Sequence, residues 1–106
     1  MEIGGSYWNR ILINSKKRNL ALEVSIKDIW DKFIKQNKKC ALSGVELSFR
    51  LENRYDGTAS IDRIDSTKGY TKENIQWIHK DLNRLKSNMT EDTLIKWCKL
   101  IVDNKT

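Results

Sequence analysis

The stretch ASIDRIDSTKGYTKENIQWIHKDLNRLK, residues 59–86, decides the fold of this chain. Residues 60–64 alternate polar and apolar side chains, as a half-buried strand does. Residues 66–73 form the connecting loop, in which Gly69 is expected to supply an unusual backbone conformation. Residues 75–78 fit either a second strand or the start of a helix, because both periods match so short a run.

The last part of the stretch, from about Lys80 to Ser87, is expected to be helical. Leu82 and Leu85 are predicted to point inward and Asn83 and Lys86 outward. The stretch therefore predicts two short extended segments followed by a helix.

Each of the two extended segments and the helix carries a side chain with an oxygen atom that could bind a metal. Asp62 lies at the end of the first strand, Asn74 at the head of the second run, and Asn83 on the helix, where Arg84 and Lys86 follow. Hard oxygen ligands carried by a hairpin and a helix suit a Mg²⁺-type cation, which keeps waters and takes few protein ligands. Asp62 and Asn83 are expected to face solvent. Basic residues around such a site favour a phosphodiester substrate and hence a metal-dependent nuclease.

Three helices are expected outside this stretch. Apolar residues at helical spacing mark residues 7–15, 25–36 and 90–102, with Ser25 and Thr90 as N-caps. The apolar face of the last helix, expected to be core, consists of Leu94, Trp97, Cys98 and Ile101. Residues 40–47 are predicted to form a tight turn and short extended piece, and residues 52–57 an exposed loop.

Length and composition predict one domain spanning residues 1–106, divided into a basic helical part (1–38), a core (39–87) and a C-terminal helix (88–106). The net charge is +6, and residues 1–40 carry +5 of it. A basic chain points to a polyanionic partner, although a solvated basic face is the alternative. No apolar run has the length of a membrane span, and no leader resembles a signal peptide. A soluble, cytoplasmic protein with reduced cysteines is expected.

The motifs together resemble the HNH (ββα-metal) endonucleases, in a phage and bacterial branch of that family. They are Cys-x-x-Ser-Gly-x-x-Leu from Cys40, Ser-Ile-Asp-Arg-Ile-Asp-Ser-x-Lys-Gly-Tyr from Ser60, Asn-Ile-Gln-Trp-Ile-His from Asn74, and Asn-x-x-Lys from Asn83. The similarity covers residues 39–86 and implies an α+β fold with a small ββα-metal core and flanking helices.

The resemblance implies a role for three of these residues. Asp62 matches the metal-binding Asp at the end of the first strand. Asn74 matches the middle Asn of the motif, which ties the loop by side-chain hydrogen bonds and is structural. Asn83 matches the helix-borne His or Asn that completes the metal site. The implied function is a Mg²⁺- or Mn²⁺-dependent DNA endonuclease in a bacterial or phage-infected cell.

Arg63 departs from the family, which usually has a His base at this position. Arginine stays protonated and cannot accept a proton, but its planar fork can hold the scissile phosphate. Asp65, His79 and Tyr70 are candidate replacement bases, with His79 preferred because an unshifted imidazole titrates near neutral pH. A module that binds DNA without cutting it is the alternative function.

Cys40 and His79 occupy positions where many HNH proteins carry the first ligand of a structural zinc pair. Ser43 and Leu82 stand at the second positions, and leucine cannot ligate zinc. Cys98 could supply a third ligand. A packed thiol and a hydrogen-bonded imidazole are therefore preferred over a zinc site.

The phosphate backbone of DNA is expected to meet basic residues where the two predicted N-terminal helices end and beside the metal site. These residues are Lys16, Lys17, Arg18, Lys38, Lys39, Arg84 and Lys86.

Overall fold

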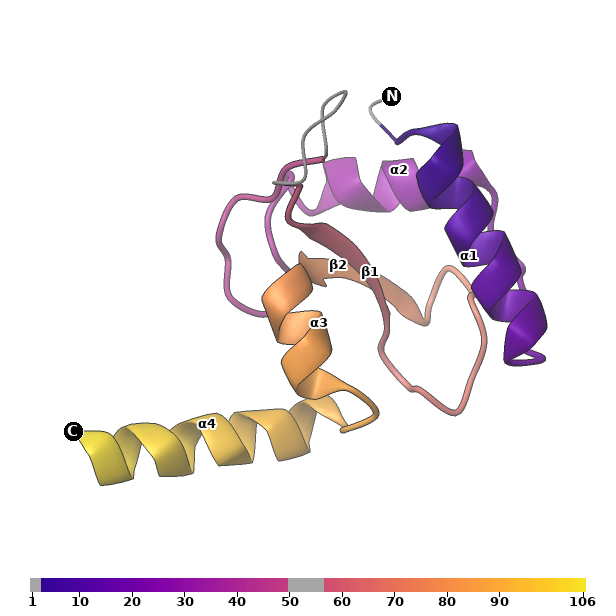
Figure 1. The fold of residues 1–106 in the computed structure, drawn as a ribbon. Coiled ribbons are helices and arrows are strands. Elements are labelled where there is room, and N and C mark those ends of the chain that lie inside the picture. The colour runs from indigo at the N-terminus through magenta and orange to yellow at the C-terminus, as the bar shows by residue number, and fades with distance from the viewer. Residues whose placement is uncertain (1–2, 50–56) are drawn as a thin grey trace.

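The computed structural model describes residues 3–49 and 57–106. Two helices precede a hairpin and two follow it (Figure 1). Helix α1 spans Gly5–Lys17 and α2 spans Ile26–Lys35. Strands β1 (Ala59–Arg63) and β2 (Ile75–His79) lead into α3 (Lys80–Lys86), and α4 (Glu91–Lys105) ends the chain. The predicted order of strand, strand and helix is confirmed, and the ambiguous run at residues 75–78 is a strand.

Helices α2 and α4 begin at the capping residues that the sequence predicts, Ser25 and Thr90. Ser25 and Asp28 form a reciprocal capping box at the start of α2: Asp28 N–H donates to Ser25 Oγ, and Ser25 N–H donates to the Asp28 carboxylate. Thr90 Oγ1 accepts from Thr93 N–H at the start of α4. These local hydrogen bonds satisfy backbone donors that the helix itself leaves free.

The two strands pair antiparallel, and Ile61 lies opposite Trp77. The outer edge of β2 at Trp77 is closed by Gln36, whose side chain both donates to and accepts from the Trp77 peptide group. At the outer edge of β1, the Tyr7 hydroxyl oxygen accepts a hydrogen bond from Ile61 N–H, and Asn83 Nδ2 donates one to Ile61 O. Side chains therefore protect both edges of a sheet that has only two strands.

The core lies between α2, the hairpin and α1. Trp77, Phe33 and Ile29 are almost completely buried, and Trp77 Nε1 donates to Ile29 O at 2.7 Å. Tyr7 and Phe49 pack edge to face or tilted against these aromatic rings. This packing fixes α2 against β2, while α3 packs on the opposite side of the hairpin (Figure 1).

The predicted role of Gly69 is wrong in its mechanism. Gly44 is the only described glycine with a positive φ (78°), so Gly69 is not needed for a left-handed conformation. A Cβ on Gly69 would instead lie 2.4 Å from Ala21 O. Glycine is required there because Tyr70 N–H donates to Ala21 O and brings the two backbones together.

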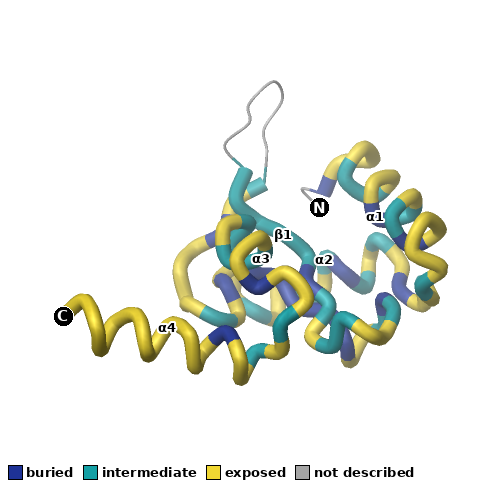
Figure 2. The backbone as a smooth tube through the Cα atoms, turned by 60° about the horizontal axis from the view of Figure 1, so that its bottom comes forward, coloured by how far each residue is buried: buried dark blue, intermediate teal, exposed yellow. Residues whose placement is uncertain are grey.

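The predicted core face of α4 is also wrong for most of its length. Leu94 is buried, but Trp97, Cys98 and Ile101 are exposed. Figure 2 shows α4 extending from the rest of the chain with its surface open to solvent.

The predicted tight turn at residues 40–47 is confirmed by Cys40 N–H donating to Val45 O and Gly44 N–H donating to Cys40 O. The loop predicted at residues 52–57 lies outside the described residues, apart from Gly57. None of the helices within residues 3–49 and 57–106 combines the length and apolar character needed to cross a membrane.

Candidate functional site

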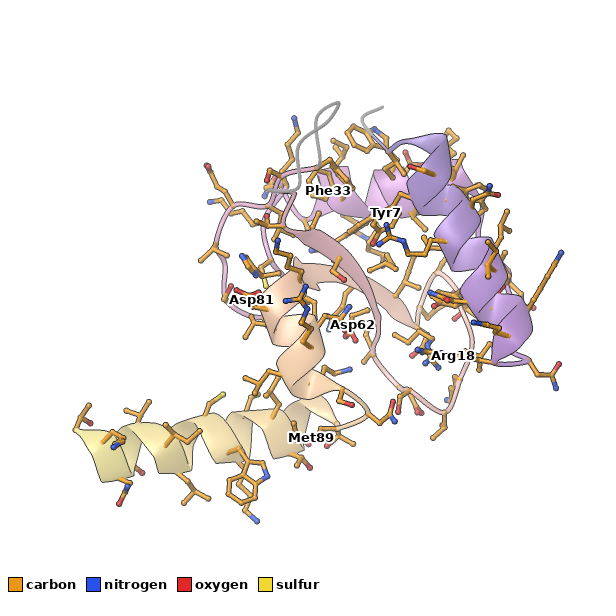
Figure 3. All side chains as sticks on the ribbon, in the orientation of Figure 1. Tyr7, Arg18, Phe33, Asp62, Asp81 and Met89 are labelled. Carbon is orange, nitrogen blue, oxygen red and sulfur yellow. The ribbon has the colours of Figure 1, made fainter. Side chains whose placement is uncertain are left out.

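Asp62 is the central carboxylate of the site and lies between β1 and α3 (Figure 3). Its side chain is buried. Its Oδ2 accepts from Gln76 Nε2 at 2.9 Å, and its Oδ1 accepts from Lys86 Nζ at 3.0 Å. Asp62 and Gln76 are partners in the hairpin, so their side chains share one face of the sheet. Helix α3 brings Lys86 onto that face. The expectation that Asp62 faces solvent is wrong.

Lys86 is buried rather than exposed, which overturns its predicted place on the DNA-binding surface. Its ammonium group donates to Asp62 and also to Arg63 O at 3.1 Å. Leu82 and Lys86 are four residues apart and therefore share the inward face of α3. Leu85 is rotated away from that face and is 54% exposed, so its predicted inward position is wrong as well.

Asn83 lies on the same helix and reaches the outer edge of β1. Its Nδ2 donates to Ser60 Oγ at 2.7 Å and to Ile61 O at 3.0 Å. A carbonyl oxygen only accepts, so the amide nitrogen must be the atom that faces it. Asn83 Oδ1 therefore points away from Ile61 O and forms no hydrogen bond within residues 3–49 and 57–106.

The oxygen atoms of Asp62 and Asn83 are of the chemical type that a magnesium-type ion binds. Each carboxylate oxygen of Asp62 accepts one hydrogen bond and keeps further acceptor capacity, and Asn83 contributes Oδ1. One carboxylate and one amide are enough for Mg²⁺, which keeps several of its waters. No group of three His, Cys, Asp or Glu side chains that could hold a metal occurs among the described residues. Lys86 is the cation that would compete with a metal at Asp62.

Both residues line a cleft of about 820 Å³ that follows the outer edge of β1. Side chains from α1 and α3 form its two walls, and Figure 3 shows Tyr7 and Arg18 on the side of α1. The cationic residues that line the cleft are Arg10, Arg18, Arg63, Lys80 and Arg84. Asp62 is the only carboxylate among the described lining residues. The cleft therefore suits an anion of high charge.

Tyr7 connects α1 to the floor of this cleft. Its hydroxyl oxygen accepts from Ile61 N–H at 2.9 Å, and burial raises the pKa of the phenol. The hydrogen bond spans 54 positions in the sequence, so no local pattern predicts it. Gln76 likewise has no sequence signal of its own, and its position opposite Asp62 follows only from the strand register.

Arg63 lines the cleft but uses part of its guanidinium group to hold a loop. Its Nη1 donates to Ser66 O at 2.6 Å and to Lys68 O at 2.9 Å. The guanidinium carbon lies 5.7 Å from the centre of the Tyr70 ring. Its Nε and Nη2 donors form no hydrogen bond with residues 3–49 or 57–106, so the side chain combines a structural contact with donors that an anion can use.

The loop between the strands is tied by Asn74, as predicted. Asn74 Oδ1 accepts from Asp65 N–H, and its Nδ2 donates to Asp65 O and Gly69 O. The Asp65 carboxylate accepts from the hydroxyl and the amide of Thr67, and these hydrogen bonds lower the pKa of Asp65. A lowered pKa makes this carboxylate a weaker base, so the geometry does not favour Asp65 as the general base.

His79 lies apart from the cleft lining. It follows Ile78 in β2 and faces the side of the hairpin opposite to Asp62, because side chains alternate along a strand. Its Nδ1 accepts from Asp81 N–H at 3.0 Å and caps α3. The structure does not bring His79 together with Asp62 and Asn83.

Cys40 is a packed thiol beside the backbone of His79. Its sulfur accepts from Ser43 N–H and His79 N–H, both at 3.4 Å. Burial raises the pKa of this thiol, but the hydrogen bonds from Ser43, His79 and Leu42 outweigh burial and lower it. Cys98 lies on the exposed surface of α4.

The other predicted DNA-binding residues divide into three groups. Arg18 and Arg84 line the cleft, whereas Lys16 and Lys17 are exposed in the last turn of α1. Lys38 and Lys39 follow Gln36, which closes the outer edge of β2, on the side of the hairpin away from the cleft.

Comparison with known proteins supports the fold. No protein-family model matches the chain, and no curated protein matches its sequence. The chain is similar to the solved structure of PacI, a rare-cutting HNH restriction endonuclease, with a TM-score of 0.66 and 18% sequence identity. The similarity covers 92% of this chain and 75% of that chain. The chain therefore has a small α+β, HNH-like fold.

Proposed function

We propose that this protein is a divalent-metal-dependent DNA endonuclease that hydrolyses phosphodiester bonds in the cleft between α1 and α3. The observation that carries the proposal is that Asp62 and Asn83, from a strand and a helix, line one cleft whose other charged residues are cationic. A carboxylate and an amide suit Mg²⁺ or Mn²⁺, and the arginines suit a phosphate. The HNH-like fold of a DNA-cutting neighbour agrees with this assignment.

In this proposal Asp62 and Asn83 hold the metal, which would acidify a bound water and stabilise charge on the phosphate. Gln76 and Lys86 orient the Asp62 carboxylate, because each donates a hydrogen bond to one of its oxygens. The free donors of Arg63 bind the scissile phosphate, and Arg10, Arg18 and Arg84 hold the flanking backbone.

A plasmid-cleavage assay with Mg²⁺ or Mn²⁺, with and without EDTA, tests this function. We expect Asn83→Ala and the double variant Asp62→Asn/Lys86→Met to abolish or severely reduce cleavage while DNA binding and the circular-dichroism spectrum are kept. Asp62→Asn alone should also lose cleavage, but it leaves Lys86 buried without its partner and should therefore be less stable. Asp31→Asn, at an exposed carboxylate on α2, is the matched control and should cleave like the wild type. Full cleavage by Asp62→Asn, or activity unaffected by EDTA, would rule out the proposed metal site.

One observation favours a second candidate, a DNA-binding module without nuclease activity. The Lys86 ammonium group already neutralises Asp62, and Arg63 stands where the resembling family has a His base. Under this alternative the wild type binds DNA through the cleft but leaves plasmid intact with every divalent metal tested.

A further inference from the structure

Two hydroxyl groups, those of Tyr7 and Ser60, lie beside Asn83 at the outer edge of β1. Ile61 N–H donates to the Tyr7 oxygen at 2.9 Å. Asn83 Nδ2 donates to the Ser60 oxygen at 2.7 Å and to Ile61 O at 3.0 Å. The N–H and C=O of one strand residue point to the same side of the strand, so Tyr7 and Asn83 are neighbours along this edge. Helices α1 and α3 therefore meet at a single residue of β1.

The two hydroxyl groups also lie close to the candidate metal ligands. Ser60 and Asp62 are two residues apart in β1, so their side chains share one face of the strand. Tyr7, Ser60, Asp62 and Asn83 all line the cleft. Burial raises the pKa of the Tyr7 phenol, and its hydrogen bonds with Ile61 and Ser60 offset this only in part. Tyr7 is therefore protonated at neutral pH and acts as a hydrogen-bond donor, not as a base.

The two hydroxyl groups carry one more hydrogen than they can use between themselves. Each oxygen accepts from an N–H group that cannot accept in return, Ile61 N–H for Tyr7 and Asn83 Nδ2 for Ser60. One hydroxyl hydrogen is shared between Tyr7 and Ser60. The other has no acceptor within residues 3–49 and 57–106. Whichever hydroxyl donates to its neighbour, one unpaired O–H group remains at the wall of the cleft.

We propose that this unpaired O–H group donates a hydrogen bond to a non-bridging oxygen of the scissile phosphate, beside Asp62 and Asn83. The proposal rests on the proposed nuclease function. A phosphate oxygen carries negative charge and only accepts, so a hydrogen bond from a fixed hydroxyl to it is charge-assisted and strong. Negative charge on the phosphate oxygens must also be stabilised during phosphodiester hydrolysis, and a donor held in place by the fold needs no reorganisation to do so.

The shared hydrogen makes the two hydroxyl groups replace each other. Tyr7→Phe releases the Ser60 hydroxyl from its neighbour, and Ser60→Ala releases the Tyr7 hydroxyl, so each single variant keeps one O–H donor at the cleft. Only the double variant Tyr7→Phe/Ser60→Ala has none. Two residues that merely stabilise each other would give the opposite result, because the first change already removes their interaction and the second then costs less.

Cleavage rates of plasmid with Mg²⁺ test the proposal. Tyr7→Phe and Ser60→Ala should each slow cleavage modestly, and the double variant should be slower by roughly 10²- to 10³-fold, the usual loss for one charge-stabilising donor. Tyr7→Phe/Ser60→Thr regains a hydroxyl and should cleave like Tyr7→Phe. The matched control is Ser66→Ala, because the Ser66 hydroxyl lines the cleft but already donates to Asn88 O. It should cleave like the wild type.

DNA affinity in EDTA, measured by fluorescence anisotropy, tests the same contact without cleavage. The double variant should bind roughly 10- to 100-fold more weakly than the wild type, as expected for the loss of a hydrogen bond to a charged group. The two single variants and Tyr7→Phe/Ser60→Thr should lose much less. Circular dichroism of each variant confirms that the fold is kept.

The two assays separate this proposal from the proposed nuclease function. If the wild type binds DNA without cutting it, the nuclease function is wrong, but a disproportionate loss of affinity in the double variant still assigns the hydroxyl pair to phosphate binding. If the wild type cuts DNA and the double variant loses no more than the product of the two single effects in either assay, the hydroxyl pair has no contact with the phosphate and the proposal is overturned.

Discussion

The Nζ atom of Lys86 lies 3.0 Å from Oδ1 of Asp62, and both side chains are buried, to 1% and 4% of residual exposure. Breaking a buried ion pair by removing one partner leaves an uncompensated charge, which costs far more than the loss of an exposed pair. Lys86 is therefore a structural counter-ion of the candidate metal ligand and not a surface contact for DNA.

Lys86→Met should lower the free energy of unfolding by about 3–5 kcal/mol, because Asp62 is left as a buried charge without its partner. Added Mg²⁺ should recover part of this loss, since the ion can replace the ammonium group at Asp62. Melting temperatures measured across a Mg²⁺ titration check the prediction. The double variant Asp62→Asn/Lys86→Met is the control. It lacks the Asp62 carboxylate, so its melting temperature should not rise with Mg²⁺. Equal Mg²⁺ responses of Lys86→Met and the wild type would mean that Lys86 does not compete with a metal.

Replacing Arg10 and Arg18 with alanine should weaken DNA binding evenly across sequences. The slope of log affinity against log salt should fall by about 0.9 for each phosphate that is no longer neutralised, hence by about two units. The matched control is the pair Lys38→Ala and Lys39→Ala, which removes the same charge from the side of the hairpin away from the cleft. Fluorescence anisotropy over a salt series measures both slopes. A larger change in slope for the lysine pair would mean that DNA binds on the side of the hairpin away from the cleft.

Arg63→Ala should reduce cleavage by roughly 10²- to 10³-fold, as loss of one preorganised charge-stabilising group does. It should also lower the melting temperature, because Ser66 O and Lys68 O lose their shared donor. Arg63→Lys should recover stability only partly, since an ammonium group lacks the planar fork. Arg63→His should retain or raise activity if the position faces the attacking water. The cleavage rate of this variant should then change with pH near neutrality, where histidine titrates. A flat pH profile for that variant would exclude this arrangement.

Thr67→Val should destabilise the protein at neutral pH by removing the hydroxyl donor to Asp65. The pKa of Asp65 is lowered in the folded state, so its stabilising contribution is fully present above the ordinary pKa of about 4 and is lost as the pH falls through the lower folded value. The stability difference between wild type and variant should therefore shrink in acid. Urea unfolding at neutral and acidic pH measures this difference. A difference that stays constant with pH would assign the effect of Thr67 to packing rather than to the carboxylate.

Gly69→Ala should destabilise the protein by about 1–3 kcal/mol, the usual cost of forcing atoms into a filled space. The new methyl carbon would lie 2.4 Å and 2.8 Å from the backbone O and N of Ala21. Gly5→Ala is the control, because its methyl group would meet nothing within 4 Å. Thermal unfolding of both variants is sufficient. Equal melting temperatures would show that residues 20–24 move away from the loop at little cost.

The sequence by itself determined the elements whose signals are local. The Ser25–Asp28 capping box and the Thr90 cap each form within one turn of helix, and the alternation at residues 60–64 needs no distant partner. The loop-tying role of Asn74 follows from the resemblance to the HNH endonucleases, and its three hydrogen bonds also stay within one loop. Short-range contacts depend on spacing along the chain, and spacing is visible in the sequence.

Only the tertiary structure decided which side of each helix is covered. An apolar pattern shows that a helix has an inward face, but the partner elements determine where that face lies. The pairing of Asp62 with Lys86 sets the rotation of α3, so Lys86 is buried and Leu85 is exposed. Helix α4 has an apolar face with almost no partner in the described chain, so Trp97 and Ile101 stay exposed. Contacts such as Tyr7 with Ile61 join distant segments, and their geometry exists only once the core has brought those segments together.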